Sequence, residues 1–263
     1  MTPSGTKHLQ INTPHFQATG ISDVGRERPR NEDSIYLDES GHFVLLADGM
    51  GGHERGAEAS STILNVIQEY LQPEALNEQL MDITDVEGVS SELVCLSSLV
   101  GDAVEKANSV LYERNQQLEL ERYMGTTVVG LVPVAGEYVL WFHVGDSRLY
   151  LWRDSTLKCL TTDHSAFAEW DRNGRTGQEP KKNIITRAIG PHAGTSPDIS
   201  WHKWQKDDIY FLCSDGLTDM VTEDQIVRIL NPQQDVDHIA RQLIDAANEA
   251  GGKDNVSVVV CKF

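Results

Sequence analysis

The segment from Phe43 to His53 reads FVLLADGMGGH, with Asp48 directly after five apolar residues and Gly49, Gly51 and Gly52 within the next four positions. A short apolar run bounded by a turn signal is typical of a buried strand. Glycines this close together indicate a backbone that approaches a bound group, because glycine has no side chain to keep one away. The segment therefore predicts a core strand that ends in a carboxylate beside a binding loop.

Four further acids stand at the ends of strand-like runs: Asp33 before Ser34–Leu37, Asp146 after Trp141–Gly145, Asp215 after Tyr210–Ser214 and Asp254 before Val256–Val260. A single Asp-Gly pair is ordinarily a turn signal, so any one of these acids has a purely structural explanation. Five carboxylates that converge would raise one another's pKa and oppose folding unless a cation neutralised them. Oxygen ligands without a Cys or His cluster suit Mg²⁺ or Mn²⁺ better than zinc.

Segments rich in β-branched, aromatic and aliphatic residues are predicted to be strands: Ser34–Leu37, His42–Ala47, Thr126–Val134, Glu137–Val144, Ser147–Arg153, Ile209–Ser214 and Val256–Lys262. Short turns join several of them, which favours antiparallel pairing. Apolar periodicity and capping patterns predict helices over Gly56–Leu71, Ser91–Leu118, Ile226–Leu230 after a capping box at Thr222, and Val236–Ala250. Each helix pair would cover one sheet face, which gives an α+β fold.

The charge balance excludes some partners. The 263 residues carry 22 Lys+Arg and 40 Asp+Glu, a formal net charge of −18. An excess this large argues against a general nucleic-acid or anionic-membrane binder, because phosphate-rich surfaces would be repelled. No apolar run approaches the ~18 residues that a membrane span needs, and the first residues lack an apolar signal core. We therefore expect no nucleic-acid partner, no membrane partner and a cytoplasmic location.

The chain reads as one domain without an internal linker. Residues 1–17 are polar and aperiodic, so we expect a flexible leader there, with the folded domain over 18–263. The acidic stretch Gln72–Val89 is predicted to be an irregular excursion between two helices. Cys95, Cys159, Cys213 and Cys261 form no CxxC pair, and we expect them to be free thiols in apolar surroundings.

Seven motifs appear in order along the chain: RPRNED at Arg28–Asp33, DGMGGH at Asp48–His53, GTT at Gly125–Thr127, VGDSR at Val144–Arg148, ITRAIG at Ile185–Gly190, SDGL at Ser214–Leu217 and Asp254-Asn255. Together they resemble the metal-dependent serine/threonine protein phosphatases (the PPM, or type-2C, family) in bacterial form, over about residues 18–263. The resemblance implies a four-layer α-β-β-α sandwich, in which two central antiparallel sheets are flanked by helix pairs.

The resemblance also implies a metal site. Asp48 matches the acid that bridges two Mn²⁺ or Mg²⁺ ions, and the carbonyl of Gly49 would complete one coordination shell. Positions matching Asp215 and Asp254 bind the other ion, and Asp146 with Asp215 matches a third, weaker site. Asp33 matches an acid that holds the metals directly or through water. Glu32, beside it, and Asn255 are expected to support these ligands from behind.

Two further residues take roles from the resemblance. Arg28 matches the position that grips the substrate phosphate, where a guanidinium can bind two oxygens; the alternative is that Arg28, like Arg26 or Arg30, is a solvated charge. His53 is a candidate proton donor to the leaving alkoxide. Its alternative role is to orient the glycine loop at a helix start, and Met50 occupies the position where some family members place a histidine.

The segment from about 164 to 184 corresponds to the flap beside the family's active site. From His164 to Gly190 it carries five Lys or Arg against three Asp or Glu, inside an otherwise acidic chain. The flap is therefore expected to influence substrate choice, although its charges would equally suit a solvated loop. Gly174 and Gly177 favour a mobile segment.

The sequence thus predicts a hydrolase that removes phosphate from phosphoserine and phosphothreonine on proteins by attack of a metal-activated water. Its partners would be phosphoproteins and a bacterial-type serine/threonine kinase, and we expect a monomer. Two alternatives stay open: a binding module that keeps the fold without turnover, and a metal-dependent phosphohydrolase for small molecules. Retention of Asp48, Asp215 and Asp254 together speaks against the first alternative.

Overall fold

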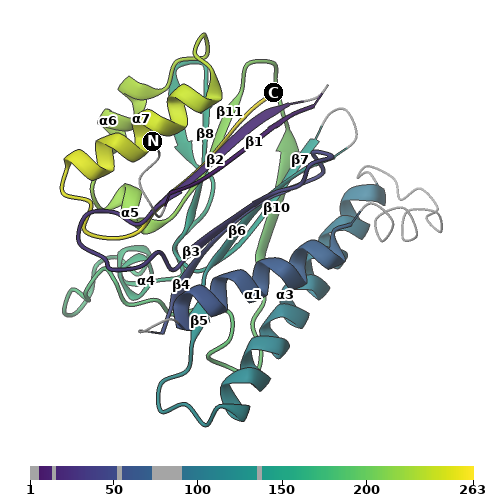
Figure 1. Cartoon of the computed structure of the whole chain (residues 1–263), viewed down its shortest axis with the longest axis vertical. Coiled ribbons are helices and arrows are strands. Elements are labelled where there is room, and N and C mark those ends of the chain that lie inside the picture. The colour runs from purple at the N-terminus through teal and green to yellow at the C-terminus, as the bar shows by residue number, and fades with distance from the viewer. Residues whose placement is uncertain (1–5, 14–15, 52–54, 73–90, 135–137) are drawn as a thin grey trace.

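The computed structural model describes residues 6–13, 16–51, 55–72, 91–134 and 138–263, and in these ranges two antiparallel sheets pack face to face between helices (Figure 1). The first sheet has the order β1 (Lys7–Asn12), β2 (Gln17–Asp23), β12 (Val256–Lys262), β11 (Ile209–Cys213), β8 (Arg148–Arg153), β9 (Thr156–Cys159). The second has the order β10 (Asp198–Lys203), β7 (Tyr138–Val144), β6 (Val128–Val134), β4 (Val44–Met50), β3 (Asp33–Leu37). A two-residue strand, β5 (Gly125–Thr126), also pairs with β4.

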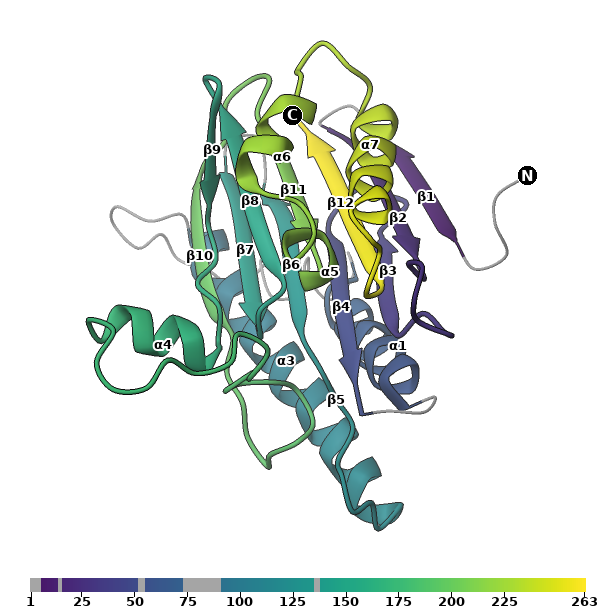
Figure 2. The ribbon, with the colours of Figure 1, turned by 90° about the vertical axis from the view of Figure 1, so that its left-hand side faces the viewer.

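Helices cover both outer faces. α1 (Arg55–Tyr70) and α3 (Ser91–Gln117) pack on the second sheet, and α6 (Glu223–Ile229) and α7 (Val236–Glu249) pack on the first. Two short helices, α4 (Ala166–Arg172) and α5 (Asp215–Thr218), lie outside these pairs, and α4 stands out from the side of the sandwich (Figure 2). The predicted four-layer α+β sandwich is confirmed.

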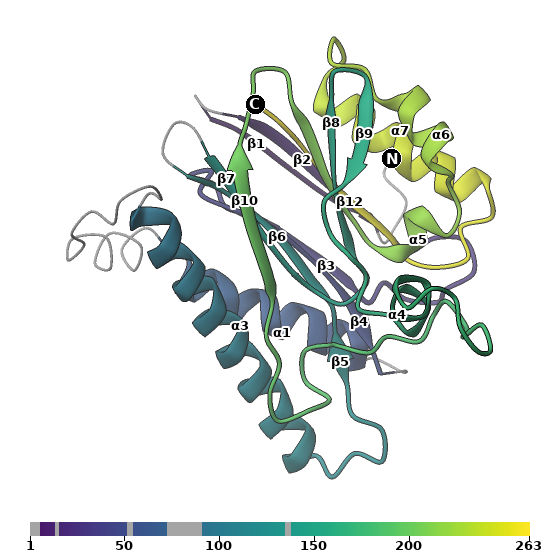
Figure 3. The same cartoon turned by 180° about the vertical axis from the view of Figure 1, so that it is seen from behind.

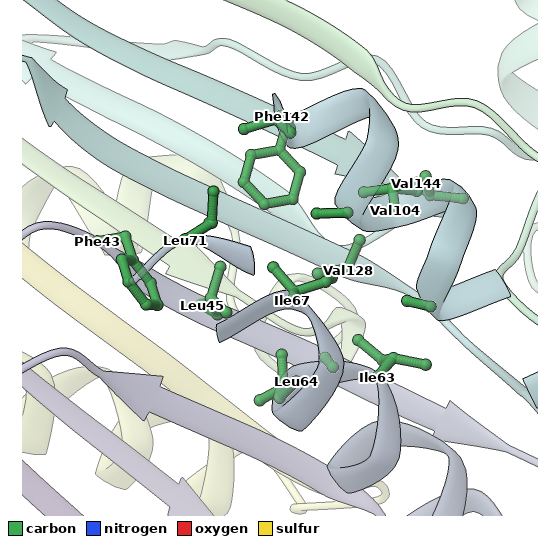
Figure 4. Close-up of a cluster of buried hydrophobic side chains, with 14 of the residues drawn as sticks. Phe43, Leu45, Ile63, Leu64, Ile67, Leu71, Val104, Val128, Phe142 and Val144 are labelled. Carbon is green, nitrogen blue, oxygen red and sulfur yellow. The ribbon is translucent and has the colours of Figure 1, made fainter. Parts of the chain in front are cut away.

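The period of two along each central strand explains why apolar residues fill both faces. In β4, Leu45 and Ala47 contact α1 and α3, whereas Val44 and Leu46 face the opposite sheet. Figure 4 shows Leu45 in the helix-facing core, together with Ile63 and Leu64 of α1 and Val104 of α3. Strands β11 and β12 alternate in the same way between α7 and the inter-sheet core. Such strands read as unbroken apolar runs and were predictable for that reason.

The expectation of a flexible leader over residues 1–17 is wrong. Residues 7–12 form β1, which pairs with β2 along its whole length from Lys7 opposite Ser22 to Asn12 opposite Gln17. β1 is an edge strand with the sequence KHLQIN and only partial burial, so it lacks the apolar run that marks a core strand. The sandwich therefore begins at Lys7.

Other short elements were also missed. β9 and β10 are edge strands, β2 carries a polar and small-residue sequence, and α4 lies inside the flap. The predicted excursion over Gln72–Val89 lies outside the described residues apart from Gln72. None of the four cysteines forms a disulfide, and Cys213 and Cys261 are fully buried, as expected for small apolar side chains. Among the described residues, the helices are too short or too polar to cross a bilayer.

Candidate active site

Strand pairing brings the five predicted acids to one end of the sandwich. Asp33 at the start of β3 is the register partner of Asp48 near the end of β4. Asp215 follows β11 and Asp254 precedes β12, and these two strands are antiparallel neighbours, so the acids share an end of the first sheet. Asp146 lies where the chain crosses from β7 in the second sheet to β8 in the first. The cluster therefore draws on both sheets and on the crossing between them.

The carboxylates are close enough to perturb one another. Burial raises the pKa of Asp48 well above its usual range, and the charges of Asp33, Asp215, Asp146 and Asp254 each raise it further. Burial raises the pKa of Asp146 to about 7, with Asp215 and Asp163 adding to the rise. Burial and Asp254 are the leading causes that raise the pKa of Asp215 to about 6. Protein charges alone therefore leave this cluster short of positive charge.

Asp33 shows this shortage most directly. Its two carboxylate oxygens are buried and accept no hydrogen bond of ordinary geometry from the described residues. Burial raises its pKa to about 7; the hydroxyls of Ser257 and Ser214 lower it, whereas Asp215 and Asp254 add to the rise. A buried carboxylate without partners is costly unless something compensates it. The oxygen-only donor set and this unpartnered acid fit a hard divalent cation.

The loop between β2 and β3 carries Arg28 to the same cluster. The Arg28 Nη2 donates to Asp254 Oδ2 at 2.6 Å, and the Arg28 side chain is about half exposed. Desolvation opposes the charged form, but the contact with Asp254 raises the pKa of Arg28. The guanidinium of Arg28 thus lies at the solvent-facing edge of the acidic cluster, and its role toward the substrate stays a prediction.

Asn255 holds this loop in place. Its side-chain amide donates to the carbonyls of Val24 at 2.9 Å and Arg30 at 2.8 Å, and its Oδ1 accepts from the Glu32 amide at 2.8 Å. Asn255 is buried, and these three bonds are partly buried. Asn255 directly precedes β12, and its side chain thus anchors Val24 and Arg30, which lie on either side of Arg28 in the sequence.

Glu32 and Gly49 are joined through the backbone. The Gly49 amide donates to the Glu32 carbonyl at 3.2 Å, and the Ser60 hydroxyl of α1 donates to the same carbonyl at 2.6 Å. A Cβ on Gly49 would lie 2.0 Å from the carbonyl oxygen of Gly56 and 2.6 Å from that of Glu32. Only glycine fits here, because β4 passes directly against the start of α1.

The GTT motif, to which the sequence assigned no role, holds the backbone of Asp48. The Asp48 amide donates to the Thr127 hydroxyl at 3.0 Å, and the Asp48 carbonyl accepts from the Thr126 hydroxyl at 2.8 Å and the Thr127 amide at 2.9 Å. The Thr127 and Ser147 hydroxyls also share a hydrogen bond of 2.7 Å next to Asp146. The sequence feature that could have indicated this support of the Asp48 backbone is the pair of adjacent threonines directly before a core strand.

A pocket separates the cluster from the flap. Asp146, Asp215 and Thr218 line one side, and Phe167, Lys182 and Asn183 of the flap line another. Residues of helices α4 and α5 thus both contribute to its wall. Figure 3 shows the two helices on the same side of the sandwich. At the base of the flap, Arg148 donates to both Asp163 oxygens, at 2.8 and 2.7 Å. His53 and its neighbour Gly52 lie outside the described residues, so the role of His53 stays a prediction.

Comparison with known proteins identifies the family. A family model described as Protein phosphatase 2C matches residues 24–252. The serine/threonine phosphatase stp of Listeria welshimeri is 33% identical over 249 residues, which are 91% of this chain and 92% of that protein.

Solved structures agree. The crystal structure of the Mycobacterium tuberculosis serine/threonine phosphatase PstP/Ppp has a TM-score of 0.77 and 31% identity, over 97% of this chain and 99% of that one. The catalytic domain of PstP in complex with two manganese ions has a TM-score of 0.74 and 33% identity, over 94% and 97%. The chain belongs to the protein phosphatase 2C family, the metal-dependent serine/threonine protein phosphatases.

Proposed function

We propose that this phosphatase binds its divalent cations through Asp33, Asp48, Asp146, Asp215 and Asp254, and uses them to hydrolyse phosphoserine and phosphothreonine on proteins. The observation that carries the assignment is the buried, unpartnered carboxylate of Asp33 inside a cluster whose members raise one another's pKa. Added positive charge would stabilise such a cluster. Among the described side chains, Arg28 supplies a positive charge in contact with it, at Asp254.

The protein's own residues have separate tasks in this scheme. When bound, the ions supply the positive charge that activates water and neutralises phosphoryl oxygens. Asp48 is held between Asp33 and the threonines of the GTT motif, so its carboxylate is fixed before substrate arrives. A fixed ligand lowers the reorganisation needed during the reaction. The Gly49 carbonyl remains a predicted ligand.

Arg28 is proposed to bind the substrate phosphate. Its guanidinium reaches the edge of the cluster on a loop that Asn255 anchors at two carbonyls. A planar guanidinium can donate to two phosphoryl oxygens at once, whereas it donates to a single oxygen of Asp254 here. Exchange of Asp254 for phosphate would therefore improve its hydrogen bonding and place the phosphate beside the cations.

The assignment is tested by phosphate release from a phosphothreonine peptide with Mn²⁺, with and without chelator, in the wild type and in Asp48→Ala and Asp254→Ala. We expect no turnover in chelator and loss of turnover in both variants. Asp154→Asn is the matched control, because Asp154 is an exposed residue in the turn between β8 and β9. Full activity in Asp48→Ala would refute the ligand assignment, and turnover of free phosphomonoesters alone would favour a small-molecule phosphohydrolase.

The physiological setting follows from the family and the thiols. We propose that the enzyme opposes a bacterial-type serine/threonine kinase and acts as a monomer in the cytoplasm. Four cysteines that form no disulfide suit a reducing compartment. Light scattering on the purified chain tests the monomer, and a rise in phosphothreonine on the kinase or its targets after gene deletion tests the partnership.

A further inference from the structure

His164, at the base of the flap, forms two hydrogen bonds with the turn that carries Asp146. The Gly145 amide donates to His164 Nδ1 at 3.0 Å, and the His164 amide donates to the Gly145 carbonyl at 2.9 Å. Both polar backbone groups of Gly145 are thus satisfied by one residue that lies 19 positions further along the chain. Gly145 has a φ of +107°, a backbone conformation that glycine adopts readily and other residues rarely do.

The hydrogen bond from Gly145 determines where the ring proton of His164 lies. A nitrogen that accepts a backbone N–H has its lone pair free, so the proton of the neutral ring is on Nε2. Nε2 lies 3.3 Å from Asp198 Oδ2 without a hydrogen bond of ordinary geometry, and Asp198 Oδ1 accepts from Arg187 at 2.6 Å. Burial lowers the pKa of His164, and the neighbouring His143 ring lowers it further, which keeps the ring neutral.

A metal site is the competing explanation for this cluster. Ligand atoms of His143, His164 and Asp198 lie within 4.8 Å of one another, and the two rings stack at 4.5 Å. A metal at His164 Nε2 would require that nitrogen to lose its proton to Nδ1, and the new N–H would then point at the N–H of Gly145. His143 Nε2 lies 3.0 Å from the Thr162 carbonyl, which places the proton of that ring on Nε2 and leaves Nδ1 with a free lone pair. The hydrogen bond between the Gly145 amide and His164 Nδ1 therefore favours a positioning role for His164 over metal binding at its Nε2.

The same residue is joined to the flap. The Thr186 amide donates to the His164 carbonyl at 2.8 Å, and the Ala166 amide donates to the Ile184 carbonyl at 2.8 Å, so the two ends of the flap are held together next to His164. The Ser165 hydroxyl caps α4 by accepting from the Ala168 amide at 3.2 Å. The turn with Asp146 and the base of the flap thus meet at His164, the turn through its ring and amide and the flap through its carbonyl, beside the pocket that both line.

We propose that His164 is a positioning residue that sets the Asp146 turn relative to the flap, with the Gly145 amide fixing its tautomer and Asp198 lying next to its Nε2. The expected effect of His164 on catalysis rests on the proposed function, in which Asp146 is a metal ligand. The hydrogen bonds between His164 and Gly145 do not depend on that assignment. Loss of the Nδ1 acceptor would let the Gly145–Asp146 turn move. The affinity for the cation that Asp146 helps to hold would then fall, while the ligands on the other strands stay in place.

Asparagine and glutamine substitutions separate the two ring nitrogens. His164→Asn keeps an acceptor at the Nδ1 position, whereas His164→Gln keeps a polar group near the Nε2 position and removes that acceptor. We expect exchange of the Gly145 amide to be about five-fold faster in His164→Gln and close to wild type in His164→Asn, the size expected for one lost hydrogen bond. The Mn²⁺ concentration for half-maximal activity should rise in parallel, by about five-fold, in His164→Gln only.

Two more measurements keep the test decisive if a His164 variant folds poorly. In the wild type, long-range proton–nitrogen spectra should place the ring proton of His164 on Nε2. Asp198→Ala, at a side chain that is 54% exposed, should speed Gly145 exchange about two-fold, and the control His202→Asn should not, because His202 bonds the Tyr210 hydroxyl instead.

Several results would overturn the proposal: a ring proton on Nδ1, coordination of added Zn²⁺ by His164, or equal exchange of the Gly145 amide in the asparagine and glutamine variants. The exchange and tautomer measurements need neither substrate nor catalytic metal. If Asp48→Ala retained activity while these measurements gave the expected values, the ligand assignment would fail and the positioning of the turn by His164 would stand.

Discussion

Asp33 and Asp48 face each other as register partners across β3 and β4, and the charge on Asp33 raises the pKa of Asp48. Like charges directly opposite in a sheet destabilise the pairing. The metal-free fold is therefore destabilised at the place where we propose that the cations bind, and this destabilisation can be measured separately from catalysis.

Asp33→Asn should stabilise the metal-free protein and weaken the metal-bound enzyme. A carboxamide removes a charge that is buried without hydrogen-bond partners and relieves repulsion on Asp48. We expect the Tm without metal to rise by about 3 °C at pH 8, given about 2–4 °C per kcal/mol for a chain of this size, while the Mn²⁺ needed for activity increases. Differential scanning calorimetry with chelator measures the first effect; a lower Tm in Asp33→Asn would contradict it.

Metal-free stability should fall as pH rises from about 4 to about 7. The pKa values of Asp33 and Asp146 are raised to about 7 and that of Asp215 to about 6, against 3.8 in the unfolded chain. In this window the folded protein holds protons that the unfolded chain has released, so raising the pH favours unfolding.

Cations replace these protons, so the increase in Tm caused by Mn²⁺ should be larger at pH 8 than at about pH 5.5. Melting curves across this range, with chelator and with saturating Mn²⁺, measure both slopes. An increase that is independent of pH would show that the carboxylates are already ionised in the metal-free fold.

The sequence was sufficient to predict strands that are buried on both faces and helix ends that a local hydrogen-bond motif defines. The bounds of β12 and the capping box of Thr222 with Gln225 agree with the structure, because an apolar run or a local hydrogen-bond motif defines each one. Edge strands such as β1 and β10 could not be predicted in this way, since they are held by pairing with other strands and their side chains are mostly polar or exposed.

The same distinction applies to the site. Strand ends and motif order were enough to select the five acids. The contacts that hold the site together join residues that are distant in sequence. They are the three hydrogen bonds of Asn255, the Arg28–Asp254 contact and the hydrogen bonds between His164 and Gly145. No local pattern encodes such contacts, so they required the folded chain.

Arg28→Ala should raise KM for a phosphopeptide by about 10- to 100-fold and change kcat much less, because a charge-assisted pair of hydrogen bonds to the substrate phosphate is lost. Arg28→Lys should recover part of the lost affinity, since the lysine ammonium keeps the positive charge but not the planar pair of donors that binds two phosphoryl oxygens at once. Arg30→Ala, an exposed neighbour on the same loop, is the control. A large fall in kcat with unchanged KM in Arg28→Ala would argue for a role in the chemical step instead.

Asn255→Asp should destabilise the protein and impair activity at saturating Mn²⁺. The substitution keeps the shape but replaces the amide that donates to the Val24 and Arg30 carbonyls with an oxygen that repels them. Two partly buried hydrogen bonds lost in this way correspond to about 1–3 kcal/mol. Urea unfolding measures the loss, and Asn65→Asp on the exposed face of α1 should leave stability within about 0.5 kcal/mol. Equal stability in both variants would show that Asn255 does not anchor the loop.

Lys182→Glu should change which phosphopeptides are preferred. Lys182 lines the pocket between the flap and Asp146, and its Nζ lies 5.4 Å from the centre of the Phe167 ring, so its charge is presented at the pocket wall. In a protein with a net charge of −18, a local positive charge beside the site should matter most for acidic substrates.

We expect kcat/KM for a peptide with acidic residues next to phosphothreonine to fall about five-fold relative to a neutral peptide, and the difference to shrink at high salt. Hydrolysis of a small phosphomonoester should be unchanged, because it does not reach the flap. Lys206→Glu, an exposed lysine between β10 and β11, controls for the change in total charge. If both variants lower the acidic-peptide rate equally, the overall field of the protein rather than the flap determines the preference.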